Sequence, residues 1–470
     1  MSTVIQEGFA PGILREYDIR GIIGQSLSEQ DAYLLGRSFA SFLAKTLHRE
    51  LDIHVCVGRD GRLSSPALHE ALCHGLQESG VHVHCIGVGP SPMLYFAVRH
   101  LDADAGIMVT GSHNPPDYNG FKMTLNPAPV FGKSIQSIGR IAQEQDFITG
   151  QGSVIDIDVS EAYIARLLRD YTNGHTLRIA WDAGNGAAGE IMRRLSEKIP
   201  GDHFLLYDEI DGRFPNHHPD PTVDRNLEDL RDLVLREGCD LGVAFDGDGD
   251  RIGVVDEHGA VIRCDTLLAL YAREVLAAHP GATIIGDVKC SQVLYDEIKR
   301  LGGQPVMWKT GHSLIKDKMQ EMHALLAGEL SGHIFFADHY YGYDDALYCA
   351  IRLFNALSEA QGGLSSLTAD LPKLYNTPEI RIEVDEARKF DLVRQIVERV
   401  ENMAQQDGTT ISTLDGLRVN TAEGWWLLRA SNTQNALVVR IESTSQKGLA
   451  ALHALVSGHM KKIGYTLSAL

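Results

Sequence analysis

Two short segments of this chain combine residue types that suit phosphoryl transfer. The first, Thr110-Gly-Ser-His-Asn-Pro-Pro-Asp-Tyr-Asn-Gly-Phe-Lys122, places the hydroxyl of Ser112 in a turn-rich loop after the apolar run 105–109. The second, Asp246-Gly-Asp-Gly-Asp-Arg251, follows the apolar run 241–245. Phosphoryl transfer needs positioning and neutralisation of charge on oxygen atoms, and little covalent chemistry from the protein. A hydroxyl and a compact oxygen-rich cation site could supply that reaction together.

Three aspartates separated by single glycines can fold round one hard cation. Without a metal ion, Asp246, Asp248 and Asp250 would repel one another strongly. Mg²⁺ suits three protein oxygens better than Ca²⁺, because Mg²⁺ usually keeps waters or takes a phosphate oxygen as a further ligand. An EF-hand does not fit, since Arg251 stands where that loop needs glycine and residues 252–256 resemble a strand. The ordered spacing also disfavours a solvated acidic turn.

The serine loop is less specific when it is taken alone. A serine in a loop rich in Gly, Asn and Pro usually stabilises the turn and has no catalytic role. A hydroxyl is also a poor nucleophile without an activating partner, and His113 and Lys122 are the candidate partners within the segment. The aspartate segment and two further loops therefore decide how the serine is interpreted.

Two downstream loops offer groups for binding a sugar phosphate, although either could be a capped turn. Gly328-Glu-Leu-Ser-Gly-His333 has a carboxylate and a hydroxyl suited to sugar hydroxyls, with an imidazole beside them. Arg429-Ala-Ser-Asn-Thr433 has an arginine fork and small donors suited to a phosphate that is not transferred. A competing pattern, Gly184-Asn-Gly-Ala-Ala-Gly189 with Asp208 and Glu209 about twenty residues on, matches a dinucleotide-binding fingerprint. The plain alternative for that pattern is a tight strand-to-helix turn.

The elements that must position these loops recur three times along the chain. In each repeat an apolar run ends in a polar loop, and a helix begins at that loop. A second apolar run follows, and a third apolar run leads into the loop that contains Ser112, Asp246 or Glu329. Such alternation indicates βαβ units and mainly parallel sheets buried on both faces. Ligands gather at the carboxyl ends of such strands, so three domains would each offer one loop to a shared cleft. The first runs with their loops are 54–62, 178–186 and 283–291, and the second runs are 81–88, 204–207 and 306–308.

The C-terminal part of the chain differs from these repeats. Residues 379–385 alternate strictly between apolar and polar types, which is typical of a strand with one solvent-exposed face. The apolar residues of 392–400 recur at helical spacing. Two more strand-like runs and a terminal helix predict a smaller α+β domain. The expected class is therefore α/β, with three similar mixed α/β domains whose strands are flanked by helices, plus this C-terminal domain, around a central cleft. The predicted boundaries are 1–157 with the serine loop, 158–260 with the aspartate loop, 261–372 with the sugar-binding loop and 373–470 with the Arg429 loop.

The composition favours a reduced cytoplasmic protein and still allows an anionic small molecule as its ligand. The 470 residues have a formal net charge of −19, which argues against nucleic-acid binding because that needs a broad basic surface. Neither a signal peptide nor a membrane span of ~18 apolar residues is expected. The seven cysteines are scattered without C-x-x-C spacing, so we expect a reduced protein without disulfides or structural zinc. The sequence does not indicate an oligomeric state.

The four loops, taken in order, resemble those of the α-D-phosphohexomutases, and most those of the bacterial phosphomannomutase/phosphoglucomutase group. The segments 15–21, 287–291 and 309–313 fit the same family, and the likeness runs from about Arg15 to the C-terminus. The resemblance implies a four-domain, heart-shaped isomerase that interconverts hexose 1-phosphate and hexose 6-phosphate. It leaves open whether the sugar is mannose, glucose or both.

The resemblance also implies how the residues would act. Ser112 would be carried as phosphoserine, whose charge near −2 requires a cation beside it. The phosphoryl group would pass to a sugar 1-phosphate and give a hexose 1,6-bisphosphate, which is both intermediate and activator. Lys122 or His333 would serve as acid or base. The implied catalytic residues are Ser112, His113, Lys122, Arg20, Arg251, His312 and His333; the substrate-binding residues are Tyr17, Lys289, Glu329, Ser331, His333, Arg429, Ser431, Asn432 and Thr433; the Mg²⁺ ligands are Ser112, Asp246, Asp248 and Asp250.

Three other functions remain as alternatives. A Mg²⁺-dependent sugar-phosphate phosphatase would use the same serine and hydrolyse the phosphoserine. A nicotinamide oxidoreductase would use the glycine pattern 184–189, and a non-catalytic sensor would bind a sugar phosphate or Ca²⁺. The mutase is favoured because only it uses all four loops at once.

Overall fold

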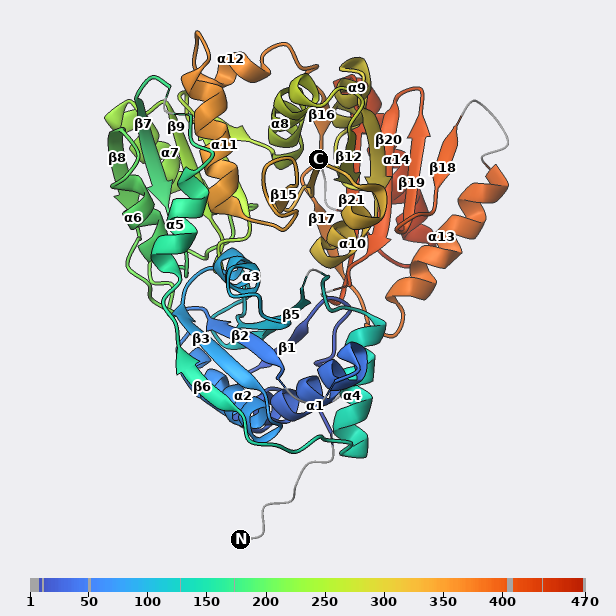
Figure 1. The fold of residues 1–470 in the computed structure, drawn as a ribbon. Helices are drawn as coiled ribbons and strands as arrows, with labels where there is room; N and C mark the ends of the chain where they lie inside the picture. The colour runs from blue at the N-terminus through green and yellow to red at the C-terminus, as the bar shows by residue number, and fades with distance from the viewer. Residues whose placement is uncertain are drawn as a thin grey trace.

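The computed structural model describes residues 8–10, 12–49, 52–126, 128–172, 174–403, 409–432 and 434–467. Within these residues the strands form four sheets in succession along the chain. Figure 1 shows the first unit at the bottom in blue, the second at the upper left in green, the third at the top centre, and the last at the right in orange and red. The predicted α/β class, with three mixed units and a smaller C-terminal unit, is confirmed.

The first sheet has the strand order β1-β5-β4-β2-β3-β6 in the described chain. Helices α1, α2 and α4 contribute to one apolar core with Val55 and Val57 of β2, and α3 packs in a second core with Cys56. The strands are β1 Ile19–Ile22, β2 His54–Arg59, β3 His82–Val88, β4 Ala105–Val109, β5 Tyr118–Leu125 and β6 Ser153–Asp156, and the helices are α1 Glu29–Leu47, α2 Ser65–Glu78, α3 Ser91–His100 and α4 Lys133–Glu144.

The second and third sheets have the orders β11-β10-β9-β7-β8 and β13-β12-β14-β15 over the described residues. Their strands are β7 Leu177–Asp182, β8 Gly201–Leu206, β9 Leu241–Phe245, β10 Ile252–Asp256, β11 Val261–Ile262, β12 Thr283–Asp287, β13 Gln304–Trp308, β14 Leu326–Gly328 and β15 Ile334–Phe336. Their helices are α5 Ser160–Leu168, α6 Gly189–Ser196, α7 Glu228–Glu237 after a 3₁₀ turn at Asp224–Leu227, α8 Cys264–Ala278, α9 Gln292–Arg300, α10 His312–Met322, α11 Ala346–Ser358 and α12 Leu364–Thr368.

One topology recurs in these three units. The first strand of the repeat lies between the second and third, parallel to both, and a fourth strand pairs antiparallel with the third. The connection between the third and fourth strands is too short for a crossover, so the pairing there is antiparallel rather than parallel. The serine loop, the aspartate loop and the loop 328–333, for which the sequence predicts sugar binding, are these three connections, between β4 and β5, β9 and β10, and β14 and β15.

The C-terminal sheet has the order β16-β21-β20-β19-β18, and β17 also pairs with β21. Every strand pair given for this sheet is antiparallel, and α13 and α14 supply residues to its apolar core. The elements are β16 Tyr375–Asn376, β17 Ile380–Glu383, α13 Lys389–Met403, β18 Thr410–Ser412, β19 Leu417–Thr421, β20 Gly424–Ala430, β21 Ala436–Ser443 and α14 Gln446–Lys462.

The three α/β units share one continuous apolar core. Val98 of α3, Trp181 of β7, Leu268 of α8 and Phe354 of α11 belong to the same buried cluster, so side chains from all three units pack together. β11 hydrogen-bonds with β10 directly beyond the predicted boundary at residue 260. The predicted boundaries themselves stay a prediction. Within the described part of the chain, no helix combines the length and apolar character needed to span a bilayer.

Candidate active site

The serine loop is held by a carboxylate at the end of β2. Asp60 Oδ2 accepts hydrogen bonds from Thr110 Oγ1 at 2.8 Å and from Gly111 N at 3.0 Å. Thr110 Oγ1 in turn accepts from Ser112 N at 2.8 Å. Ser112 is buried and has a φ of 49°, in the left-handed region that residues other than glycine rarely adopt. Such a conformation is retained where the surroundings fix it, often at a functional position.

Arg62 fixes the remainder of the serine loop. Its buried guanidinium donates to four carbonyl oxygens, those of Ser112 at 2.7 Å, Asn114 at 2.6 Å, Pro115 at 2.5 Å and Tyr118 at 3.0 Å. It also lies 3.2 Å from the Asp60 carboxylate. Because the planar fork of arginine is pre-organised, one side chain can satisfy several acceptors in a fixed geometry. The hydroxyl of Ser112 is therefore presented by a rigid loop.

The aspartate loop lies directly against the serine loop. Ser112 Oγ donates a hydrogen bond to Asp246 Oδ2 at 2.9 Å. A Cβ on Gly247 would lie 2.3 Å from Ser112 O, so only glycine permits this approach of the two backbones. Asp246 Oδ1 accepts from the backbone N–H groups of Asp250 and Arg251, both at 3.1 Å. The two segments with the most specific chemistry in the sequence thus meet between the first and second sheets.

The three aspartates of this loop fit a hard divalent cation. One oxygen from each of Asp246, Asp248 and Asp250 lies within 4.8 Å of the other two, and all three side chains are buried. Among the described residues, Asp248 Oδ1 has no hydrogen-bond partner. Burial, followed by the charges of Asp250 and Asp248, raises the pKa of Asp246 well above its usual value. A buried oxygen without a partner and mutually repelling carboxylates both fit a cation-binding set, and all-oxygen ligands suit Mg²⁺.

Lys122, on β5, reaches the same carboxylates. Its ammonium group donates to Asp248 Oδ2 at 2.6 Å and to Asp250 Oδ2. Burial disfavours the charged ammonium, but the two carboxylates outweigh burial and hold the pKa of Lys122 well above its usual value. Ser91, at the start of α3, also donates its hydroxyl to Asp248 Oδ2, at 2.5 Å. Lys122 therefore brings a fixed positive charge to the carboxylates beside Ser112.

His333 joins the third unit to this cluster. Its Nε2 lies 3.2 Å from Asp250 Oδ1, and its Nδ1 lies 2.8 Å from Glu329 Oε2. Burial alone would lower the pKa of His333, but Asp250 and Glu329 raise it to about 9. Glu329 Oε1 accepts from Gly311 N at 2.6 Å, and Ser331 Oγ lies 3.4 Å from His333 Nδ1. The loop 328–333 is thereby fixed next to the aspartate loop.

Two further histidines are partly buried and have a lowered pKa. Burial, followed by nearby positive charges, holds the pKa of His113 and of His312 well below the usual value. His113 Nδ1 lies 3.3 Å from Ser112 Oγ. The ring centroid of His312 lies 5.4 Å from that of His333. Both rings are therefore near the residues that could react, and neither adds positive charge there.

Two arginines add positive charge around the same cluster. Arg251 Nε lies 4.0 Å from Asp246 Oδ2 and 3.3 Å from His333 Nε2. Arg20, on β1, lies close enough for its charge to help lower the pKa of His113. The structure thus gathers the residues of the implied catalytic set from the first three units.

Tyr17 links the C-terminal unit to the first and third units. Its hydroxyl donates to Thr310 O at 2.8 Å and accepts from Asn432 Nδ2 at 2.5 Å. Asn432 lies between β20 and β21, in the loop for which the sequence predicts phosphate binding. Arg429 Nε, at the end of β20, donates to Asp415 Oδ2 at 3.0 Å. The loop is therefore held against Tyr17 by one bond and against its own unit by another.

The remaining predicted binding residues lie near this junction or outside the described chain. Lys289 Nζ lies 3.1 Å from Glu379 Oε1. Ser431 Oγ accepts from Gln434 N at 3.1 Å, which closes the turn of the C-terminal loop. Thr433 lies outside the described residues. The substrate-binding roles of these residues stay predictions.

Sequence reasoning missed several residues that hold the site in place: Asp60, Arg62, Ser91 and Asp415. Asp60 and Ser91 follow closely after β2 and β3. Because the carboxyl ends of parallel strands meet at one edge of a sheet, polar residues after those strands gave a signal that could have found them. Asp415 lies in a turn between β18 and β19, where the sequence carries no comparable signal.

The glycine-rich turn 184–189 supports the aspartate loop. Ala187 N donates to Gly247 O at 2.9 Å. A Cβ on Gly186 would lie 3.1 Å from Asp246 O, so the two backbones are closely packed. The pattern is therefore the tight strand-to-helix turn, and its glycines serve backbone packing against the aspartate loop.

Four family models match the chain in order. Phosphoglucomutase/phosphomannomutase alpha/beta/alpha domain I matches residues 12–149, domain II matches 161–259, domain III matches 263–375 and the C-terminal domain matches 379–458. The chain belongs to the phosphoglucomutase/phosphomannomutase family. The predicted likeness to the α-D-phosphohexomutases is confirmed.

Relatives within the phosphoglucomutase/phosphomannomutase family match over nearly the whole chain. A phosphomannomutase/phosphoglucomutase of Pseudomonas aeruginosa strain PAO1 is 43% identical over 467 residues, with 99% of each chain covered. A phosphoglucomutase of Neisseria gonorrhoeae is 42% identical, covering 93% of this chain and 94% of its own. The crystal structure of a family protein from Burkholderia thailandensis has a TM-score of 0.89 at 40% identity, covering 98% and 99%. The predicted isomerase class is confirmed, and these relatives do not support the phosphatase alternative.

Proposed function

We propose that this enzyme interconverts hexose 1-phosphates and hexose 6-phosphates by carrying a phosphoryl group on Ser112. The 2.9 Å hydrogen bond from Ser112 Oγ to Asp246 Oδ2 carries the proposal, because it joins the candidate nucleophile to the candidate cation-binding carboxylates. Phosphoserine 112 would pass its phosphoryl group to the free hydroxyl of a hexose monophosphate. The resulting hexose 1,6-bisphosphate would turn within the site and return its other phosphoryl group to Ser112 Oγ.

The charged side chains near Ser112 suit this transfer. Lys122 and Arg251 present positive charge where negative charge builds up on phosphoryl oxygens, and such fixed charges stabilise the transition state. Lys122 Nζ and His333 Nε2 are the two candidate atoms for moving a proton to or from the sugar hydroxyl. Substituting each residue in turn would assign that role.

The aspartate loop supplies the metal site of the proposal. Asp246, Asp248 and Asp250, together with a phosphate on Ser112, would hold Mg²⁺. When bound, the ion would neutralise charge on the phosphoryl oxygens. The buried, mutually repelling carboxylates support this assignment.

The third and fourth units supply the substrate-binding groups of the proposal. Glu329 is oriented by Gly311 and His333, so its carboxylate is fixed to accept hydrogen bonds from sugar hydroxyls. Burial of the reacting side chains would keep water from the phosphoserine, which suits transfer rather than hydrolysis. The other groups for the sugar and its distal phosphate are Tyr17, Lys289, Ser331, Arg429, Ser431, Asn432 and Thr433.

The proposed substrates are small sugar phosphates, and both mannose and glucose phosphates are included. The relatives' names support both, since one is a phosphomannomutase/phosphoglucomutase and the other a phosphoglucomutase. The net charge of −19 supports a ligand other than nucleic acid. A cytoplasmic location is also part of the proposal, and the seven free cysteines support it.

Phosphorus NMR with each hexose 1-phosphate, Mg²⁺ and a trace of hexose 1,6-bisphosphate tests the proposal. We expect the wild-type enzyme to form the 6-phosphate without inorganic phosphate. Ser112→Ala should lower turnover by at least about 10³-fold because the nucleophile is lost. Ser366→Ala, in an exposed position of α12, is the matched control and should keep wild-type turnover. Inorganic phosphate in place of 6-phosphate, or full activity of Ser112→Ala, would contradict the proposal.

A further inference from the structure

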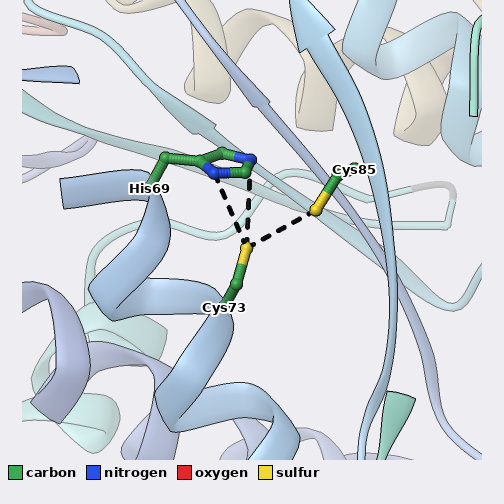
Figure 2. Close-up of side chains that lie close together, drawn as sticks. All are labelled: His69, Cys73 and Cys85. Carbon is green, nitrogen blue, oxygen red and sulfur yellow. Dashed lines mark hydrogen bonds between the residues drawn. The ribbon is translucent and has the colours of Figure 1, made fainter. Parts of the chain in front are cut away.

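Three potential metal ligands lie together in the first unit, outside the site described above. His69 and Cys73 are one turn apart on α2, and Cys85 lies on β3 (Figure 2). Cys73 Sγ is 3.7 Å from Cys85 Sγ and 3.8 Å from His69 Nε2. One ligand atom from each residue lies within 4.8 Å of the other two. The two sulfur atoms point toward each other with the imidazole ring beside them (Figure 2).

We propose that His69, Cys73 and Cys85 bind one thiophilic metal ion, Zn²⁺. Two thiolates and an imidazole are ligands that Zn²⁺ prefers in proteins. Two Zn–S bonds of about 2.3 Å span the observed 3.7 Å at an angle of about 107°, which is close to tetrahedral. The sulfur atoms therefore already have the separation of two thiolates on one ion.

The surroundings of the thiols suit a bound cation. Asp156 of β6 is paired in register with Cys85, and its charge acts on both thiols. Because residues paired in register point to the same face of a sheet, the Asp156 carboxylate is a candidate fourth ligand. His69 is partly exposed, which gives an ion a route from solvent.

The proposed zinc site is connected to the serine loop through α2. Ser65, one turn before His69, donates to Asp60 Oδ1 at 2.5 Å. The other oxygen of Asp60 holds Thr110 and Gly111 of the serine loop. An ion that ties α2 to β3 would therefore stabilise the helix that supports this loop. The pattern H-x₃-C-x₁₁-C differs from common zinc spacings, which is why the sequence alone predicts no structural zinc.

Titration of the reduced, metal-free enzyme with Co²⁺ in excess Mg²⁺ tests the proposal by absorption. Cobalt bound to thiolates gives a charge-transfer band, whereas cobalt on the aspartate loop has only oxygen ligands and gives none. We expect this band to saturate at one equivalent and to disappear when one equivalent of Zn²⁺ is added. Cys73→Ser and Cys85→Ser should abolish the band. His69→Gln should weaken the affinity at least about tenfold, and His74→Gln, exposed on the same helix, should leave it unchanged.

Several outcomes would overturn the zinc proposal. They are the absence of a thiolate band at stoichiometric Co²⁺, a band that persists in Cys85→Ser, and equal affinity in His69→Gln and His74→Gln. A Cys73–Cys85 disulfide that forms in air without metal uptake, detected by intact mass, would also overturn it. The His69→Gln measurement decides the question even if the buried cysteine variants fold poorly, because His69 is partly exposed. The absorption readout is independent of turnover, so this result is separate from the test of the mutase proposal.

Discussion

Replacing Gly247 with alanine tests whether the serine loop and the aspartate loop must touch. The added Cβ would lie 2.3 Å from Ser112 O and 3.4 Å from Pro219 Cγ. The nearer neighbour is backbone and cannot rotate away as a side chain could. The two loops would have to separate by about 1 Å to restore an ordinary C···O distance of roughly 3.3 Å.

The kinetic effect follows from this displacement. Misplacing reacting groups by about 1 Å costs about 100-fold in rate, or about 2.7 kcal/mol of transition-state stabilisation. Overpacking itself costs about 1–3 kcal/mol of folding free energy. We therefore expect Gly247→Ala to fold and to lower kcat/KM about 100-fold. Most of the loss should be in kcat, because Arg429 and Asn432 lie in a different loop.

The assay follows formation of glucose 6-phosphate from glucose 1-phosphate through a coupled dehydrogenase. The matched control is Gly458→Ala in α14, since no described atom lies within 4 Å of its added Cβ. Thermal unfolding of both variants shows whether the fold is retained. A kcat/KM of Gly247→Ala within about threefold of the control would refute the reasoning.

Four further outcomes are expected from the structure. Arg62→Lys should lower both Tm and kcat, because the three donors of one ammonium cannot satisfy four carbonyls and each unpaired acceptor costs about 1–3 kcal/mol; unfolding and steady-state assays would show it. Tyr17→Phe should raise KM roughly tenfold with kcat nearly unchanged, because the bond to Asn432 is lost. Chelation by EDTA should abolish turnover, and Mg²⁺ should restore it, in the coupled assay. Burial raises the pKa of Asp345 to about 6, above its unfolded value of about 3.8, so stability should fall by about 2 kcal/mol as pH rises from 4 to 7. Asp345→Asn should remove this fall in Tm measurements, and an equal pH dependence in both proteins would contradict it.

The repeated fold could be predicted because the first strand of each repeat is mostly buried. The apolar runs beginning at residues 54, 178 and 283 correspond to β2, β7 and β12, and each is followed by a helix. Buried parallel strands appear in sequence as continuous apolar runs, which is a strong signal. The short strands β16 and β18 were missed because exposed or partly exposed strands of two or three residues lack such a signal, and β19 was missed because Arg418 and Asn420 interrupt its apolar residues.

The site could be predicted only where its chemistry is local in sequence. The regular spacing of Asp246, Asp248 and Asp250 indicates a cation site from the sequence alone. Ser112 becomes a candidate nucleophile only when it is considered together with that site. The anchors of the serine loop were not predictable in the same way, because Arg62 acts on backbone carbonyls that have no side-chain signature. The Tyr17–Asn432 bond joins residues far apart in the chain, so only the folded structure reveals it.

The phosphorylation state of Ser112 during turnover tests the central claim most directly. The enzyme would be incubated with hexose 1,6-bisphosphate and Mg²⁺, and the peptides would be examined by mass spectrometry before and after hexose monophosphate is added. We expect one phosphoryl group on Ser112, lost upon addition of monophosphate and absent in Ser112→Ala. Turnover by an enzyme whose Ser112 never carries a phosphoryl group would contradict the proposed mechanism.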